Sequence, residues 1–257
     1  MDKPNLESYF HTCYFLATAE KCFYIFRSYP DITSVTDTNT VNHGLECEQE
    51  IWRHHSYLHP WLNTFRGLDT TGLPKLYRFP VVGLFNPTTL RHVLTLGRIS
   101  QWIDESPRHV VEIGGSYGML AAMMLLYYSI ADYTLIEVPS VAALGERFLA
   151  HAGLDFRATF ISSFPDTALK SPECDLVISC YALSELDRDQ QDWYIDNVLI
   201  NARAGFLVMN SCSNGYPRLE MIQRLEEKLE TQVICEREIP LTHKDNYTLM
   251  WKRGNDA

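Results

Sequence analysis

The sequence of 257 residues lacks any segment that would anchor it in a membrane or direct it to the secretory pathway. No window approaches the roughly 20 continuous apolar residues that a membrane-spanning helix needs. The first residues, MDKPNLESYF, begin with an acid and have no basic stretch ahead of an apolar one, so no signal peptide is predicted. We therefore expect a cytoplasmic protein that does not bind a membrane.

Cysteine motifs are missing as well. The seven cysteines are odd in number and form no Cys-x-x-Cys pair, and several lie in apolar runs that are typical of buried strands. This pattern disfavours a disulfide-stabilised secreted domain and favours reduced thiols in a core. A chain of this length buries a full core without disulfides or structural metals.

Long runs of lysine and arginine are also absent, and the formal net charge is −10. A polyanionic partner would have to bind against that field, which disfavours nucleic acids and anionic membrane surfaces. The sequence therefore predicts a small molecule as the partner and no nucleic acid.

The chain changes in character near residue 105, where a regular alternation of apolar strands and helices begins. Such alternation predicts an α/β domain over residues 105–257, with a mostly parallel sheet flanked by helices. The last two strands are joined by a short link, which predicts an antiparallel pair at one edge. Seven strands are expected, at residues 109–113, 133–137, 157–162, 174–180, 205–210, 232–239 and 247–252. Helices are expected at residues 117–131, 140–152, 188–201 and 217–229.

Residues 1–104 are rich in aromatic residues and histidine and show no such alternation. Their spacing predicts helices over residues 10–26, 46–65 and 88–104. The stretch DITSVTDTNT, residues 31–40, is predicted to be a polar loop. We interpret this region as a mostly helical cap that binds substrate or forms homodimer contacts.

The run VEIGGSYG, residues 111–118, joins the first strand of the sheet to a helix through a glycine-rich turn. This order is typical of nucleotide-binding units, in which glycines let backbone amides approach a ligand at the start of a helix. The dinucleotide pattern G-x-G-x-x-G does not fit, because Ser116 stands at its second glycine and Gly118 follows too soon. Glu112 on the strand, with Gly114 and Gly115 after it, instead favours S-adenosylmethionine, which carries an ammonium and a sulfonium and has no phosphate.

An acid ends the second strand, as expected for a residue that binds the two ribose hydroxyls of an adenosine. This acid is Glu137, and Val138 beside it is a further candidate contact of the cofactor. The alternative is that the glycines only allow tight packing of strand on helix and that Glu137 is an ordinary surface acid. Further cofactor candidates lie at the end of the third strand, namely Ser162, Ser163 and Phe164, and at the end of the fourth, Ser179. For the three residues of the third strand, the alternative is a plain turn.

Four runs of the sequence together resemble class I S-adenosylmethionine-dependent methyltransferases: VEIGGSYGMLA, YTLIEVPSV, DLVISCYALSEL and PLTHKDNYTLMW. Within that class the chain is similar to a bacterial group of sugar O-methyltransferases, through IEVP, SEL and the pair His243 and Asn246. The resemblance implies a Rossmann-like fold, S-adenosylmethionine as methyl donor, and an acceptor hydroxyl on a sugar or glycosylated natural product.

Methyl transfer to a hydroxyl requires alignment of the acceptor and removal of its proton. His243 is one candidate base, since the ordinary pKa of histidine is near neutral; the alternative is a surface histidine in a polar turn. Glu185 is the other, just past the fourth strand; the alternative is an acid that stabilises a helix N-terminus. Tyr181 and Asn210 are candidates for orienting the acceptor.

His55 and His59 are four residues apart, a spacing that places two metal ligands on one face of a helix. No acidic trio accompanies them, so we predict no metal site and assign both histidines to the acceptor pocket or the packing of the cap. Two other functions remain open: a non-catalytic methyltransferase-like binding protein and a nicotinamide-dependent oxidoreductase. Peptides and other non-sugar acceptors also remain open.

Overall fold

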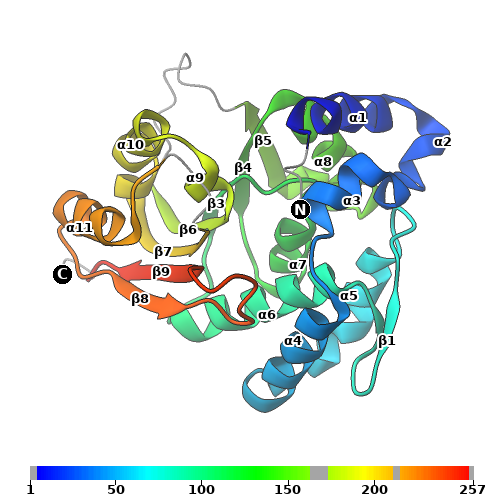
Figure 1. Cartoon of the computed structure of the whole chain (residues 1–257), viewed down its shortest axis with the longest axis horizontal. Helices are drawn as coiled ribbons and strands as arrows, with labels where there is room; N and C mark the ends of the chain where they lie inside the picture. Colours follow the sequence, from blue (N-terminus) through cyan, green and yellow to red (C-terminus); the bar gives the residue numbers. More distant parts are fainter. Residues whose placement is uncertain (1–4, 163–172, 211–214, 255–257) are drawn as a thin grey trace. The chain divides into compact units, whose positions relative to one another are not determined.

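The computed structural model describes residues 5–162, 173–210 and 215–254 (Figure 1). The chain forms two compact units. The first unit contains residues 1–104 together with residues 116–127 and 139–156, and the second contains residues 105–115, 128–138 and 157–257. The chain was expected to divide once, after residue 104. It divides at more than one place, because residues 116–127 and 139–156 belong to the first unit.

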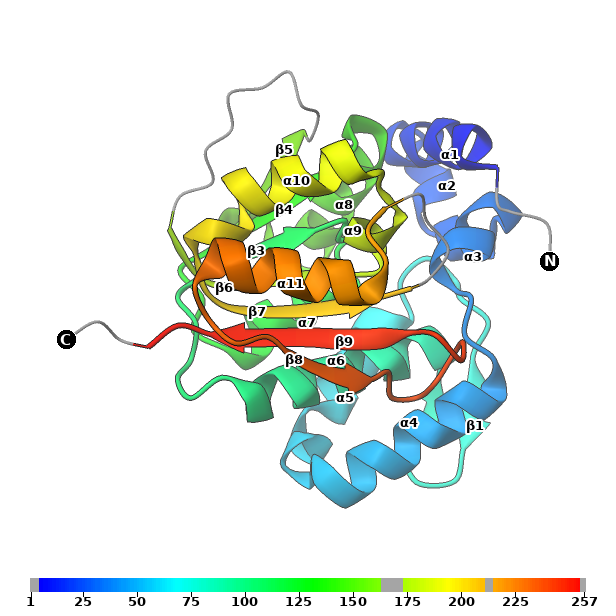
Figure 2. The same cartoon turned by 60° about the vertical axis from the view of Figure 1, so that its left-hand side comes forward.

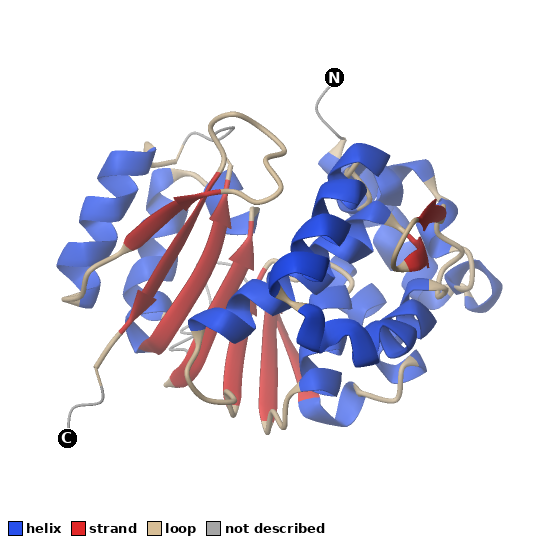
Figure 3. Ribbon diagram, turned by 90° about the horizontal axis from the view of Figure 1, so that it is seen from below, coloured by secondary structure: helices blue, strands red, loops and turns tan. Residues whose placement is uncertain are grey.

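The second unit is built on a seven-stranded sheet with the order β5-β4-β3-β6-β7-β9-β8, drawn in red in Figure 3. β5, β4, β3, β6 and β7 pair in parallel, whereas β9 is antiparallel to both of its neighbours, β7 and β8. This confirms the predicted α/β fold with its antiparallel last strand. The strands span His109–Ile113 (β3), Asp132–Glu137 (β4), Ala158–Ser162 (β5), Cys174–Cys180 (β6), Ala202–Met209 (β7), Ile234–Arg237 (β8) and Tyr247–Lys252 (β9).

The strands form where β-branched and other apolar residues run together, as buried parallel strands require. The middle of β6, Leu176 to Ile178, has no exposed surface. Gly205 on β7 allows a close approach across the sheet, since an added Cβ would lie 2.1 Å from the ring of Trp251. A smaller residue in place of Trp251 would therefore leave a cavity, and a larger residue in place of Gly205 would overpack the same part of the core.

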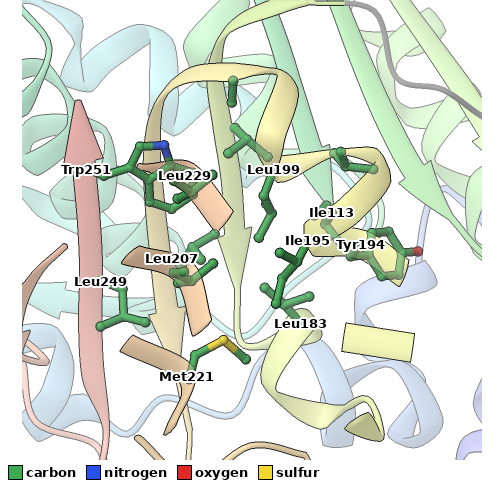
Figure 4. Packing of buried hydrophobic residues seen from close by; sticks show 14 of the residues in the cluster. Ile113, Leu183, Tyr194, Ile195, Leu199, Leu207, Met221, Leu229, Leu249 and Trp251 are labelled. Atoms are coloured by element: carbon green, nitrogen blue, oxygen red, sulfur yellow. The ribbon is translucent and has the colours of Figure 1, made fainter. Parts of the chain in front are cut away.

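Two helices, α10 and α11, cover one face of this sheet (Figures 1 and 2). The helices of the second unit are α9 (Ala182–Glu185), α10 (Arg188–Asn197) and α11 (Arg218–Leu229). Their apolar residues meet the strands in one buried cluster, in which Ile195, Leu207 and Met221 have no exposed surface (Figure 4). α10 begins with a capping box in which the Asp187 carboxylate accepts from the Gln190 amide at 2.9 Å.

The first unit is mostly helical, as predicted. Its helices are α1 (Leu6–Thr18), α2 (Glu20–Phe23), α3 (Pro30–Thr36), α4 (Val41–His54), α5 (Leu62–Asp69), α6 (Pro87–Trp102), α7 (Met119–Tyr127) and α8 (Pro139–His151), with a hairpin of β1 (Tyr77–Phe79) and β2 (Gly83–Phe85). Among the described residues, short 3-10 helices span Phe26–Ser28, Ser56–Trp61, Asp155–Arg157 and Leu199–Asn201.

The helix predicted over residues 88–104 is confirmed as α6, whereas three other predictions for this region need correction. The polar loop predicted at residues 31–40 is present only over residues 37–40, because Pro30 fixes the first turn of α3, which continues to Thr36. The helix expected over residues 10–26 breaks at Ala19, whose backbone is extended. The helix expected over residues 46–65 ends at His54, and Pro60 lies in the 3-10 segment that follows.

Hydrogen bonds from Arg147 on α8 explain why this helix belongs to the first unit. Its guanidinium donates to the carbonyls that end α1, with distances of 3.1 Å to Leu16, 2.8 Å to Ala17 and 3.2 Å to Ala19. A cation at the carbonyl end of a helix is favourable with the helix dipole. The bonds bind residues more than 120 positions apart into one unit.

Among the described residues no helix combines the length and apolar content that spanning a bilayer requires. The described cysteines are all free thiols. Cys13, Cys47 and Cys174 are buried, as expected for core thiols, whereas Cys235 is exposed on the edge strand β8.

Candidate functional site

The parallel strands of the second unit end at one common edge of the sheet. β3 lies between β4 and β6, and the strand order reverses there, because β4 and β5 extend the sheet to one side of β3 and β6 and β7 to the other. In open α/β sheets ligands bind beyond the carboxyl ends of the strands at such a reversal. The segments that follow β3, β4, β6, β7 and β8 therefore form the candidate site.

The turn after β3 begins with Gly114, which needs to be a glycine for two reasons. Its φ is +71°, in the left-handed region that favours glycine. An added Cβ would lie 2.0 Å from the Cβ of Ala182, at the start of α9. The close approach of the turn after β3 to α9 therefore depends on Gly114. Its amide continues the sheet by donating to the Ile136 carbonyl at 2.9 Å.

Glu112 is buried on β3 and does not face solvent. The Tyr133 hydroxyl donates a hydrogen bond of 2.7 Å to its carboxylate. Burial raises the pKa of Glu112 to about 7; the Tyr133 hydrogen bond opposes this rise, and the charge of Glu137 adds to it. An added Cβ at Gly115 would lie 3.0 Å from the same carboxyl group. Glu112 thus supports the turn at Gly115 from within the sheet.

Ser116 and Gly118 continue this turn and belong to the first unit. Both have positive φ, +53° for Ser116 and +87° for Gly118. The Ser116 hydroxyl lies 3.2 Å from the Tyr9 hydroxyl of α1. Ser116 and Gly118 thus adopt a left-handed backbone just before α7 begins at Met119.

Glu137 ends β4 at the same edge as the turn after β3. It is partly exposed, and its carboxylate accepts a hydrogen bond of 2.9 Å from the amide of Val138. Ser162 ends β5, pairs in register with Glu137 and is exposed. The predicted candidates Ser163 and Phe164 lie outside the described residues.

Ser179 was predicted to contact the cofactor, but its side chain is buried between the end of β3 and α9. Its side chain has no exposed surface, and its hydroxyl donates to the Ile113 carbonyl at 3.1 Å and accepts from the Leu183 amide at 3.1 Å. It therefore joins the end of β3 to α9 and positions both, instead of presenting a hydroxyl to a ligand.

A polar cluster that the sequence did not predict follows β6 and β8. The Tyr181 hydroxyl donates to the Glu238 carboxylate, which also accepts from the Thr242 amide at 2.8 Å and from Asn246 Nδ2 at 3.0 Å. Tyr181 has a φ of +71°, a strained value for a non-glycine residue, and such strain concentrates at functional sites. Glu238 is buried, and its sequence context, EREIP, resembles an ordinary charged edge strand.

Glu185 and Asn210 are close together, as an acceptor site requires. Asn210 Nδ2 donates to Glu185 Oε1 at 3.0 Å, and the Asn210 amide donates to the Ser184 hydroxyl at 2.9 Å. Glu185 is exposed as a whole residue, but partial desolvation of its carboxyl group raises its pKa, and the bond from Asn210 opposes this rise. Glu185, Asn210 and Tyr181 are thus linked through Ser184, whose hydroxyl also donates to the Tyr181 carbonyl at 2.6 Å.

His243 lies in the loop between β8 and β9. β8 runs parallel to β7, so this loop is at the carboxyl edge of the sheet, as expected. Its side chain is exposed, and its Nδ1 is 3.8 Å from the Asp245 carboxylate. Asn246 in the same loop is buried, and its Oδ1 has no hydrogen-bond partner among the described residues.

His55 and His59 belong to the first unit and do not share a helix face. His55 is buried at the end of α4, where its Nδ1 is 3.1 Å from the Tyr57 hydroxyl, and burial lowers its pKa to about 4. His59 lies in the 3-10 segment and stacks on Trp52 with ring centroids 4.7 Å apart. In the described part of the chain, no group of three His, Cys, Asp or Glu residues has an arrangement that could hold a metal ion.

The fold matches solved methyltransferases. An S-adenosylmethionine-dependent methyltransferase from Clostridium acetobutylicum matches with a TM-score of 0.50 and 9% identity, over 64% of this chain and 90% of that chain. The methyltransferase domain of bacterial CtHen1-C matches with a TM-score of 0.50 and 14% identity, over 64% of this chain and 97% of that one. The part of the chain that these structures match, 64% of it, therefore has a methyltransferase fold.

No curated protein matches the chain. One family model does: the model described as mitochondrial small ribosomal subunit Rsm22 matches residues 88–237, from α6 to the end of β8. Neither this family description nor the two structures names a sugar acceptor, so the sugar O-methyltransferase group is not confirmed. Because the match includes more than half of the 257 residues, the chain belongs to the Rsm22 family.

Proposed function

We propose that this protein is an S-adenosylmethionine-dependent methyltransferase that methylates a hydroxyl group of a sugar or another small natural product. The observation that carries the proposal is the combination of a left-handed glycine turn after β3 with an acid at the end of β4, at the reversal of strand order. The methyltransferase fold and the sequence motifs support it.

The residues at this edge fit the donor. Glu137 is partly exposed and suits the two ribose hydroxyls, because a carboxylate accepts both hydrogen bonds. Gly114 and Gly115 let the turn pack closely against Ala182 and Glu112, which fixes its backbone at the edge where the cofactor would bind. Glu112 is assigned a supporting role, since its buried carboxyl, with a pKa of about 7, faces Tyr133.

S-adenosylmethionine supplies an activated methyl group, and the chain has to bind the acceptor and take up its proton. We assign the proton to Glu185, because desolvation raises its pKa towards the range useful to a base and Asn210 fixes one of its oxygens. Tyr181, held by Glu238, orients the acceptor. His243 is the second candidate for the base; it lies at the same edge and, like Glu185, is exposed.

Donor binding is tested by calorimetry with S-adenosylmethionine on the wild type and two variants. Glu137→Ala is expected to weaken binding about tenfold or more, as loss of hydrogen bonds to a charged group does. Asp132→Ala is the matched control, because Asp132 lies on the same strand at the end away from the proposed site. Equal affinity of Glu137→Ala and wild type contradicts the assignment. Protection from thermal unfolding by NAD but not by S-adenosylmethionine favours an oxidoreductase instead.

A second candidate is a non-catalytic methyltransferase-like protein that associates with the small ribosomal subunit. The description of its family favours this candidate. Two parallel incubations with labelled S-adenosylmethionine distinguish the two candidates. One contains a small-molecule extract, and the other contains components of the small ribosomal subunit. Label in a small molecule supports the enzyme; donor binding without transfer to either mixture, together with co-sedimentation on the subunit, supports the second candidate.

A further inference from the structure

Tyr117 is the large side chain of the turn after β3, and it is buried. It stands between Ser116 and Gly118, whose φ values are +53° and +87°. Tyr117 is 3% exposed and belongs, with both neighbours, to the first unit. A close-packed ring between two left-handed residues limits the backbone on both sides of it. The contacts that hold the Tyr117 ring therefore also hold this part of the turn.

Three side chains of the first unit contact the Tyr117 ring. Phe26 and Phe148 each form a T-shaped pair with it, with ring centroids 5.0 Å and 5.2 Å away. The Arg27 guanidinium lies over the same ring, 5.6 Å from its centroid. Both arrangements are attractive, the first between rings and the second between a cation and a ring. Tyr117 is thus held by two parts of the chain, the 3-10 helix Phe26–Ser28 and α8.

Arg27 is itself held firmly in this 3-10 helix. Its guanidinium is buried and pairs with the carboxylates of Asp69 at 2.8 Å and Asp37 at 3.1 Å. Its backbone amide donates to the Gly72 carbonyl at 2.8 Å. A guanidinium fixed by two carboxylates has little freedom to move. The 3-10 helix therefore gives Tyr117 a rigid surface to pack on.

A polar contact joins α1 to the same turn. The Tyr9 hydroxyl lies 3.2 Å from the Ser116 hydroxyl, although the two residues are 107 positions apart. Tyr9 is buried, and the other end of α1 is held by the hydrogen bonds from Arg147 on α8. Withdrawal of α1 from Ser116 would therefore break bonds at both of its ends.

We propose that α1 and the 3-10 helix Phe26–Ser28 position the turn after β3 for S-adenosylmethionine, with Tyr9 acting through Ser116 and Phe26 acting through Tyr117. This inference rests on the proposed donor site. A turn that is already ordered binds more tightly, because binding then costs less conformational freedom. Tyr9 and Phe26 are positioning residues, and the N-terminal region gains a role in binding the donor.

The polar contact is tested on the full chain by calorimetry with S-adenosylmethionine. Tyr9→Phe and Ser116→Ala are each expected to weaken binding about fivefold, the usual effect of one lost hydrogen bond. Tyr9→Phe is expected to have no further effect in Ser116→Ala, where the contact is already absent. Tyr14→Phe is the control, because it makes the same change at a site on α1 that is 61% exposed. It is expected to leave the affinity within about twofold of wild type.

The ring contact is tested by comparing Phe26→Leu with Phe65→Leu. Neither phenylalanine has exposed surface, so both variants are expected to unfold at lower urea concentrations than wild type. Phe26 packs on Tyr117, whereas Phe65 of α5 stacks on Trp61. Only Phe26→Leu is expected to weaken donor binding, about fivefold. A merely structural role would lower both urea midpoints and leave both affinities unchanged.

Three results overturn the proposal when the wild type binds the donor. The first is an affinity of Tyr9→Phe equal to that of Tyr14→Phe, and the second is an equal affinity of Phe26→Leu and Phe65→Leu. The third is a loss from Tyr9→Phe that is as large in Ser116→Ala as in wild type, since Tyr9 would then not act through Ser116. If Phe26→Leu does not fold, the cycle of Tyr9 and Ser116 decides.

The failure of the proposed function has a different signature. A wild type that does not bind S-adenosylmethionine contradicts the donor site and this positioning together. A wild type that binds it, with variants that match their controls, contradicts the positioning alone.

Discussion

The Tyr181 hydroxyl donates a hydrogen bond to the Glu238 carboxylate and so joins the loop after β6 to the loop after β8, although the two residues are 57 positions apart. β7 and β9 lie between these strands in the sheet. The contact therefore fixes Tyr181, whose φ is positive, at the carboxyl edge where the acceptor is proposed to bind.

This contact predicts that Glu238→Ala destabilises the second unit strongly. Removal of the carboxylate leaves the Tyr181 hydroxyl, the Thr242 amide and Asn246 Nδ2 without their acceptor. Such losses add up to about 3 kcal/mol of unfolding free energy, measurable in urea. Glu236→Ala is the control, because Glu236 is exposed on the neighbouring strand β8. A loss no larger than that of the control would show that the cluster does not hold the loop.

The example of Glu238 explains which parts of the site were predictable from sequence. Strands such as β3, β6 and β9 were predicted residue by residue, because buried runs of apolar residues are local features. The partners of Glu238 are set by long-range packing, and nothing in its own surroundings distinguishes it from Glu236. For the same reason the sequence does not show that His243 is exposed and that Asn246, in the same loop, is buried.

Two further predictions, for residues 31–40 and for Glu112, also differ from the structure. Polarity predicted a loop at residues 31–40, but Pro30 is preorganised for the first turn of α3 and outweighs it. The role of Glu112 was misjudged because a sequence does not reveal Tyr133 on the adjacent strand, 2.7 Å from the carboxylate.

Gly114→Ala is predicted to destabilise the fold more than Gly153→Ala does. Both glycines have positive φ, +71° and +69°, so both variants have the backbone penalty of about 1 kcal/mol. Only at Gly114 does the new Cβ also collide, 2.0 Å from Ala182, whereas nothing lies within 4 Å at Gly153. Overpacking of this kind costs a further 1–3 kcal/mol, roughly. Urea unfolding of the two variants measures the difference, and equal losses would contradict the close approach of α9.

The buried carboxyl of Glu112 predicts a pH dependence of stability. Its pKa is about 7 in the folded protein and 4.5 when unperturbed, so the folded state holds a proton that the unfolded chain has lost between these values. The stability linked to this proton is fully present below pH 4.5 and is lost as the pH rises to about 7. A shift of this size corresponds to about 3 kcal/mol.

Glu112→Gln should remove this dependence, since a neutral amide still accepts from the Tyr133 hydroxyl. The variant is expected to be more stable than wild type at pH 8 and to approach it at pH 5, in urea titrations at several pH values. Glu236→Gln, at an exposed carboxylate on β8, controls for general loss of charge. A constant difference between Glu112→Gln and wild type across this range would contradict a neutral, buried carboxyl.

The two candidate bases make opposite predictions for methyl transfer, once labelled S-adenosylmethionine has identified an acceptor. Glu185→Gln keeps the shape and the bond from Asn210 Nδ2 to the side-chain oxygen but cannot take a proton, so kcat is expected to fall about 100-fold or more. Donor affinity, measured by calorimetry, is expected to stay unchanged. His243→Ala, with an exposed side chain removed, is expected to keep most of the activity.

The pH profile separates a base from a merely structural acid. Glu185 acts as a carboxylate, so kcat should rise with pH, and desolvation places the midpoint above the ordinary pKa of a glutamate. Glu185→Asp retains the titrating group and should keep that limb of the profile at a reduced rate, whereas Glu185→Gln should lose the limb. A normal profile in Glu185→Gln together with an inactive His243→Ala would move the base to the loop between β8 and β9.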